Sequence, residues 1–157
     1  MSTLNESIAI LEAMIEHEKT ISLLYEVYAE KFQEHNAFWR NLSKEEEEHA
    51  SWIKQLQKGV EDGYAQFVVD RFPLATINYS ISDIKQQIDE SKKPDFQLIN
   101  ALSVAVDIER ALIENNYFKV LAGDSDLMKS TLTLLAISTQ EHLQTVRKML
   151  NDNRQAI

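Results

Sequence analysis

The sequence contains no cysteine, only three glycines and two prolines, and fewer basic than acidic residues. The absence of cysteine excludes disulfides, thiolate metal sites and iron–sulfur centres, so electrons for any redox reaction must come from an external donor. The formal net charge of −9 repels phosphate backbones, and no basic stripe offsets this repulsion. We therefore expect no nucleic-acid partner.

Long apolar runs are also missing from the sequence. No segment approaches the roughly 20 apolar residues of a membrane span, and the start, MSTLNESIAI, lacks the basic and apolar regions of a signal peptide. The sequence thus predicts a soluble, cytoplasmic protein that has no membrane partner. Its 157 residues suit a single domain over 1–157, large enough to hold a few charged groups in its core.

Apolar residues recur in alternating steps of three and four over four long stretches, which few glycines or prolines interrupt. This periodicity predicts an all-α protein. The expected helices cover about 4–34, 37–61, 95–122 and 125–151. The first of them opens with a capping-box sequence, Thr3-Leu-Asn-Glu6.

The segment between the second and third helices, residues 62–94, is too long for a hairpin and too apolar for a free linker. Isoleucines repeat along one face of its second half and predict a short amphipathic helix there. These are Ile77, Ile81, Ile84 and Ile88. Two helical hairpins joined by one long crossover have the connectivity of a ferritin-like four-helix bundle, whereas short loops throughout would indicate an up-down-up-down bundle.

Polar residues interrupt the inward-facing positions of all four long helices. The second and fourth helices carry Glu46-x-x-His49 and Thr139-x-x-His142, and the helix before each carries one inward glutamate. Glu18 precedes His49 by 31 positions, and Glu109 precedes His142 by 33. The sequence therefore predicts two similar helical hairpins, with polar residues at matching positions along the helices.

This residue set has the chemistry of a metal site. A carboxylate and an imidazole at positions i and i+3 share one helix face, and together they suit iron, manganese or zinc. One glutamate from each of two helices plus Glu-x-x-His from each of the other two is the ligand set of di-iron and di-manganese proteins. The sequence supplies five of those six ligands: Glu18, Glu46, His49, Glu109 and His142.

Thr139 occupies the position of the sixth ligand. With three carboxylates instead of four, two divalent ions would leave an excess positive charge in the core, which weakens binding of the second ion. Glu141 lies about 100° around the helix from His142, so it could replace the missing ligand only after local unwinding. The sequence is therefore compatible with a site for one metal ion and with a site for two.

Four segments of the chain resemble the rubrerythrin-like branch of the ferritin superfamily. They are EHEKTISLLYEVYAEKF, EEEEHASWIKQL, VDIERALIENNYF and STQEHLQTVRKML. The resemblance implies metal-dependent redox chemistry with dioxygen or hydrogen peroxide, and a homodimer. Two positions depart from the family pattern, because Thr139 replaces the fourth-helix carboxylate and Leu112 replaces an additional glutamate. The cysteine-ligated electron-transfer domain of rubrerythrins is missing as well.

For a di-iron oxidoreductase of peroxidase or ferroxidase type, Glu18 and Glu109 would be terminal ligands and Glu46 a bridge. His49 and His142 would then lie at opposite ends of the site. No further catalytic residue is assigned. Two alternatives stay open: a protein that stores or senses a single metal ion, and a metal-free interaction bundle with a vestigial site.

The remaining polar and aromatic residues are expected to have structural roles. His17 and His35 are expected in solvent, and within the acidic run 45–48 only Glu46 should reach inward. The aromatic residues beside the ligand positions are expected in the core or around the site rather than as radical carriers. These are Tyr25, Trp52 and Tyr117.

Overall fold

The computed structural model describes residues 3–65, 74–114 and 126–155, and these form five α-helices and one 3₁₀ turn without a strand. The helices are α1 (Thr3–Lys31), α2 (Asn36–Glu61), α3 (Leu74–Glu90), α4 (Leu98–Glu114) and α5 (Asp126–Gln155), with η1 (Gln33–His35) between the first two. The all-α class expected from the sequence is confirmed. None of the described helices has both the length and the apolar character needed to cross a membrane.

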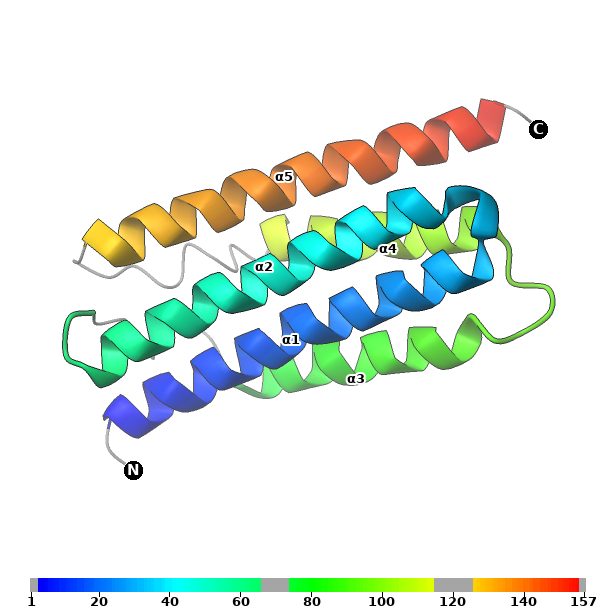
Figure 1. Ribbon diagram of the computed structural model, residues 1–157. Helices are drawn as coiled ribbons and strands as arrows, with labels where there is room; N and C mark the ends of the chain where they lie inside the picture. Colours follow the sequence, from blue (N-terminus) through cyan, green and yellow to red (C-terminus); the bar gives the residue numbers. More distant parts are fainter. Residues whose placement is uncertain (1–2, 66–73, 115–125, 156–157) are drawn as a thin grey trace.

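The helices form two antiparallel pairs (Figure 1). α1 packs against α2, α4 packs against α5, and the pairs meet through α2 and α5. α1 and α5 run in one direction along the bundle, and α2 and α4 run in the other (Figure 1). α3 lies beside α1 on the outside of this arrangement.

Small polar residues set the register between α1 and α2. The Ser22 hydroxyl donates to the Ser43 carbonyl, and the Ser43 hydroxyl donates to the Ser22 carbonyl, each at 2.8 Å. These reciprocal bonds bring the two backbones close together and satisfy both buried hydroxyl groups. At the turn, the Asn36 amide donates to the Ala29 carbonyl at 3.0 Å. This register places Glu18 opposite the second half of the Glu46-x-x-His49 motif.

The crossover helix is longer than the short helix expected from the sequence. α3 has 17 residues and begins at Leu74. It buries the predicted isoleucine stripe, with Ile77, Ile81 and Ile84 almost fully covered. Lys31 donates to the carbonyls of Ser91 and Lys93, which fixes the end of α3 to the end of α1. The crossover is therefore a packed layer over α1.

The helix boundaries differ from the expected ranges mainly at α1, α4 and α5, and α5 continues to Gln155 instead of ending at about 151. α1 ends at Lys31 instead of continuing to about 34, because η1 begins the reversal at Gln33. α4 begins at Leu98, three residues after the expected start at 95, because the backbone N–H of Gln97 donates to Asn100 Oδ1 at 2.8 Å and caps the helix there. The predicted continuation of this helix over 115–122, including Tyr117, lies outside the described residues.

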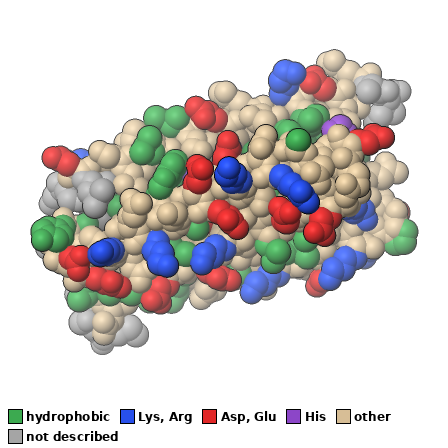
Figure 2. Space-filling model, in the orientation of Figure 1, with side chains coloured by type: hydrophobic (Ala, Val, Ile, Leu, Met, Phe, Trp, Pro, Cys, Tyr) green, Lys and Arg blue, Asp and Glu red, His purple; other side chains and the backbone are tan. Residues whose placement is uncertain are grey.

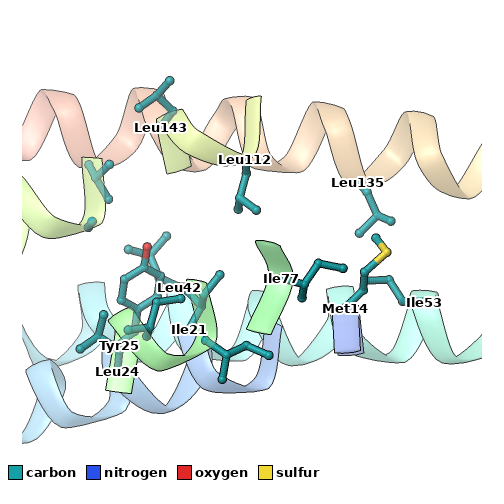
Figure 3. Close-up of a cluster of buried hydrophobic side chains, with 14 of the residues drawn as sticks. Met14, Ile21, Leu24, Tyr25, Leu42, Ile53, Ile77, Leu112, Leu135 and Leu143 are labelled. Carbon is teal, nitrogen blue, oxygen red and sulfur yellow. The ribbon is translucent and has the colours of Figure 1, made fainter. Parts of the chain in front are cut away.

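The core lies between the two helix pairs and continues under α3. Figure 3 shows Leu135 of α5 facing Met14 and Ile53 of the first hairpin. One end of the core is aromatic, with Tyr25, Tyr28 and Trp39 fully buried in contact with one another. Apolar layers thus lie on both sides of the polar residues described next.

Candidate metal centre

The five predicted ligands converge in the interior of the bundle. Glu18 lies on α1, Glu46 and His49 on α2, Glu109 on α4 and His142 on α5. All five side chains are at most 2 % exposed. Burial of so many ionisable groups is costly unless they are paired or bind metal, so their convergence marks the candidate functional site.

The Glu46 carboxylate is at the centre of the group. His49 Nδ1 donates to Glu46 Oε2 at 3.0 Å, and His142 Nδ1 donates to Glu46 Oε1 at 2.8 Å. The two imidazole rings stack with centroids 5.1 Å apart and planes 20° apart. Each imidazole therefore presents Nδ1 to a different oxygen of the same carboxylate.

The outer nitrogens of the two histidines have partners that the sequence did not reveal. His49 Nε2 lies 2.7 Å from Ser138 Oγ, which can donate to it, and His142 Nε2 lies 2.5 Å from Glu45 Oε2. The expectation that only Glu46 of the run 45–48 reaches inward was therefore wrong. The Glu45 side chain is half-exposed, so it contacts His142 from the rim of the bundle. Hydrogen bonds of this kind fix the orientation of metal-binding imidazoles.

Glu18 and Glu109 lie on either side of this central group. Glu18 Oε2 is 4.0 Å from His49 Nδ1, and Glu109 Oε1 is 3.6 Å from His142 Nδ1. The Tyr25 hydroxyl donates to Glu109 Oε1 at 2.8 Å, which agrees with its expected place beside the ligands. Trp52 also lies next to the site, with its ring 5.3 Å from that of His49.

Several buried oxygens of the site have no hydrogen-bond partner among the described residues. They are both carboxylate oxygens of Glu18, Oε2 of Glu109 and Oγ1 of Thr139. Native interiors satisfy nearly all buried polar atoms, so these oxygens beside two imidazoles could take a cation as their partner. Oxygen and imidazole nitrogen together suit a divalent transition metal, and the residues present fit such an ion.

Thr139 lies on the same inward face of α5 as His142 and is fully buried. Its hydroxyl cannot replace the charge of a carboxylate. Leu112, one turn beyond Glu109 on α4, is buried as an apolar side chain, which Figure 3 shows pointing into the core. Glu141 is exposed. Glu18, Glu46 and Glu109 are therefore the fully buried glutamates of the described site.

Burial and neighbouring charges shift the pKa values of these groups in opposite directions. Burial raises the pKa of Glu18 well above its usual value, and the Glu46 charge raises it further. Burial raises the pKa of Glu109 to about 7. Burial also disfavours ionised Glu46, but hydrogen bonds from His142 and His49 outweigh this and hold its pKa well below its usual range.

His142 carries the compensating positive charge. Burial alone would lower its pKa, but the carboxylates of Glu109 and Glu46 outweigh that effect and raise it. Both ring nitrogens face carboxylate oxygens, an arrangement that requires a proton on each. Without metal, these shifts favour a positively charged His142 ring paired with the Glu46 carboxylate, and they favour the protonated forms of Glu18 and Glu109.

His17 lies in the core, and the expectation that it lies in solvent was wrong. Its side chain is 3 % exposed, and its Nε2 lies 2.8 Å from Ser80 Oγ on α3. Burial lowers the pKa of His17 to about 4, so the ring is neutral at physiological pH. The reason for the error is that α3 covers this face of α1, and the sequence did not show which face the crossover would cover.

The geometry defines a group that could hold a metal ion. Glu46, His49 and His142 each offer one ligand atom, and these atoms lie within 4.8 Å of one another. Comparisons of the chain with protein-family models, with curated proteins and with solved structures find no match. The function is therefore inferred from the site and the arrangement of the helices.

Proposed function

We propose that this protein binds iron at the buried centre and that it is a ferritin-like, rubrerythrin-type oxidoreductase that reacts with peroxide or dioxygen. The observation that carries the proposal is the convergence of five ligand-type side chains with unsatisfied carboxylate oxygens. Oxygen and nitrogen ligands also suit manganese or zinc, so the identity of the metal is part of the test. We also propose that the protein is cytoplasmic, as expected from the sequence.

The arrangement of the helices supports the ferritin-like assignment. Two antiparallel pairs are connected by one long segment, and the helices before and after that segment, α2 and α4, run in the same direction (Figure 1). One long crossover distinguishes ferritin-like bundles from up-down-up-down bundles, in which consecutive helices alternate in direction. The five ligand positions are also distributed over all four helices of these two pairs, which supports the assignment.

Each residue would have a defined part in the iron-loaded protein. A bound iron ion would supply the redox chemistry with peroxide or dioxygen, with electrons from an external donor. Glu46 would be the central ligand, and the one shared by two ions if a second were bound, because its two oxygens already face different imidazoles. Glu18 and Glu109 would be terminal ligands, and Tyr25 would hold Glu109 in place through its hydroxyl. Ser138 and Glu45 would orient the two imidazoles from outside.

A single-metal protein that stores or senses a divalent ion is the second candidate. It is favoured by Thr139, which removes a carboxylate, and by the compact group of Glu46, His49 and His142. One ion held by this group, with Glu18 or Glu109 completing the ligand set, leaves little excess charge in the core. A metal-free interaction bundle is the third candidate, but it leaves the buried oxygens unexplained.

Metal analysis and turnover separate these candidates. Protein purified without chelator is expected to contain iron and to consume hydrogen peroxide when a chemical reductant is supplied. One ion per chain without peroxide consumption would select the storage or sensor function. Absence of bound metal after incubation with excess iron, manganese and zinc would select the metal-free bundle.

Metal affinity is expected to rise with pH. Glu18, Glu109 and His142 all have raised pKa values, so the metal-free centre retains protons that a metal ion must displace. Each displaced proton changes the affinity by about tenfold per pH unit. Titration calorimetry between pH 6 and 8, in buffers with different ionisation enthalpies, measures the number of protons that are released when the metal binds. An affinity that falls as the pH rises over this range would contradict the described protonation.

We also propose that the protein is a homodimer. A groove of about 680 Å³ lies between the exposed sides of α1 and α2, and its lining includes Leu23, which is 54 % exposed. Two lysines and two glutamates also line it, so a two-fold related copy can place opposite charges together. Basic, acidic and scattered apolar side chains are interspersed on the face that Figure 2 shows.

Light scattering is expected to give twice the chain mass of 18.1 kDa. Leu23→Glu should convert the dimer to a monomer, because it places a charge in the apolar part of the groove. Leu134→Glu is the matched control, since Leu134 is 52 % exposed on α5 and outside the groove. A wild-type protein that stays monomeric at all practical concentrations would rule out the dimer.

A further inference from the structure

A second polar site lies between α4 and α5, separate from the metal centre. It is a pocket of about 300 Å³ whose lining includes Arg110 on α4 and Arg147 and Arg154 on α5. These are three of the five arginines in the chain. The pocket shares no residue with the five predicted metal ligands, although Arg110 directly follows Glu109.

The three guanidinium groups have no acidic partner among the residues that the structure describes. Arg40, on α2, pairs with Glu26 at 3.5 Å. No corresponding ion pair is found for Arg110, Arg147 or Arg154 within the described ranges. A chain with a net charge of −9 has many carboxylates available, so three unpaired arginines around one pocket form an unusual local excess of positive charge.

The rest of the lining adds features of a small-molecule site. Val106 and Leu150 are buried and form an apolar floor. Ser103 and Asn151 contribute a hydroxyl and an amide, and Asp107 is the single acidic residue of the lining. Three arginines and one aspartate give a net charge of +2. A few polar groups around an apolar surface are typical of ligand pockets, and this volume is at the small end of their range.

We propose that this pocket binds the phosphate group of a small phosphorylated molecule. Guanidinium groups bind phosphate through paired, parallel hydrogen bonds, and several arginines together are the usual arrangement for this ligand. A phosphomonoester carries nearly two negative charges at neutral pH, which balances the net charge of the lining. The apolar floor would contact the carbon chain of the ligand, and Asp107, Ser103 and Asn151 would bind its hydroxyl groups.

The test uses the full-length protein with a chelator present, because phosphate also binds metal ions. Inorganic phosphate and glycerol 3-phosphate are titrated by calorimetry at an ionic strength held constant with chloride. Saturable binding is expected, tighter for glycerol 3-phosphate. Arg110→Gln and Arg147→Gln are each expected to weaken it by about ten- to a hundredfold. Arg40→Gln is the matched control and should leave it unchanged.

Three results would overturn the proposal. One is the absence of saturable binding by either phosphate in the wild-type protein. Another is equal binding by wild type, Arg147→Gln and Arg40→Gln, which would show that the pocket is not the site. The third is tighter binding of a poly-glutamate peptide than of glycerol 3-phosphate, which would assign the arginines to an acidic protein partner. Circular dichroism of each variant verifies that the fold is intact.

Discussion

Glu46→Gln is expected to weaken metal binding by more than about 100-fold. Its carboxylate accepts hydrogen bonds from both imidazoles, and these bonds hold its pKa well below the usual range, so it is the charge around which the centre is built. Losing a residue that only supports a ligand costs 10- to 100-fold in affinity, so losing this central carboxylate should cost more. Metal content after dialysis against limiting iron measures the effect.

Glu48→Gln is the matched control for this experiment, because Glu48 is an exposed glutamate two positions along the same helix. In the wild type, metal at about 100 times its dissociation constant should contribute about 2.7 kcal/mol, which raises the thermal midpoint by about 5–10 °C. Glu46→Gln should lose this increase and Glu48→Gln should keep it. His49→Ala and His142→Ala should lose it as well. Unchanged metal content and thermal stability in both histidine variants would mean that the assigned site is wrong.

Thr139→Glu is expected to raise the iron stoichiometry from about one to two ions per chain. Thr139 is fully buried, lies three residues before His142 and has an oxygen without a partner among the described residues. A carboxylate at this position would point into the same space as Glu46 and would supply the fourth negative charge that two divalent ions need for neutrality. Iron analysis and the absorption of an oxo-bridged iron pair after exposure to air measure the change.

Thr139→Gln separates the effect of charge from the effect of size, because glutamine has the shape of glutamate without its charge. It should not raise the stoichiometry. In the absence of metal, Thr139→Glu should lower the thermal midpoint more than Thr139→Gln does, because it adds a fourth buried carboxyl group. If the wild type already binds two iron ions, threonine is no defect and an external anion or Glu141 completes the site. If Thr139→Glu binds no more iron than the wild type, the bundle does not hold a two-metal geometry.

The sequence predicted the burial of two histidines but not of a third. His49 and His142 were placed inside because they fall on helix faces that are otherwise apolar, and repetition of the pattern made both positions recognisable. His17 occupies a face of α1 that would be exposed in a four-helix bundle alone. It is buried because α3 packs there, and its partner Ser80 is 63 positions away in the chain. Helical periodicity alone did not show which outer face the crossover would cover.

The sequence by itself determined the all-α class, the inward faces of the helices and the identity of the buried ligand-type residues, because these follow from the 3.6-residue period of a helix and the chemistry of side chains. Only the tertiary structure decided which groups touch. Three contacts of the site join residues at least 84 positions apart in the chain. They are the hydrogen bonds between Glu45 and His142, between Ser138 and His49, and between Tyr25 and Glu109. These contacts depend on how helices shift and rotate against one another. In the first hairpin, the hydrogen bonds between Ser22 and Ser43 and the packing of α3 on α1 fix the positions of the helices. The local sequence does not encode these positions.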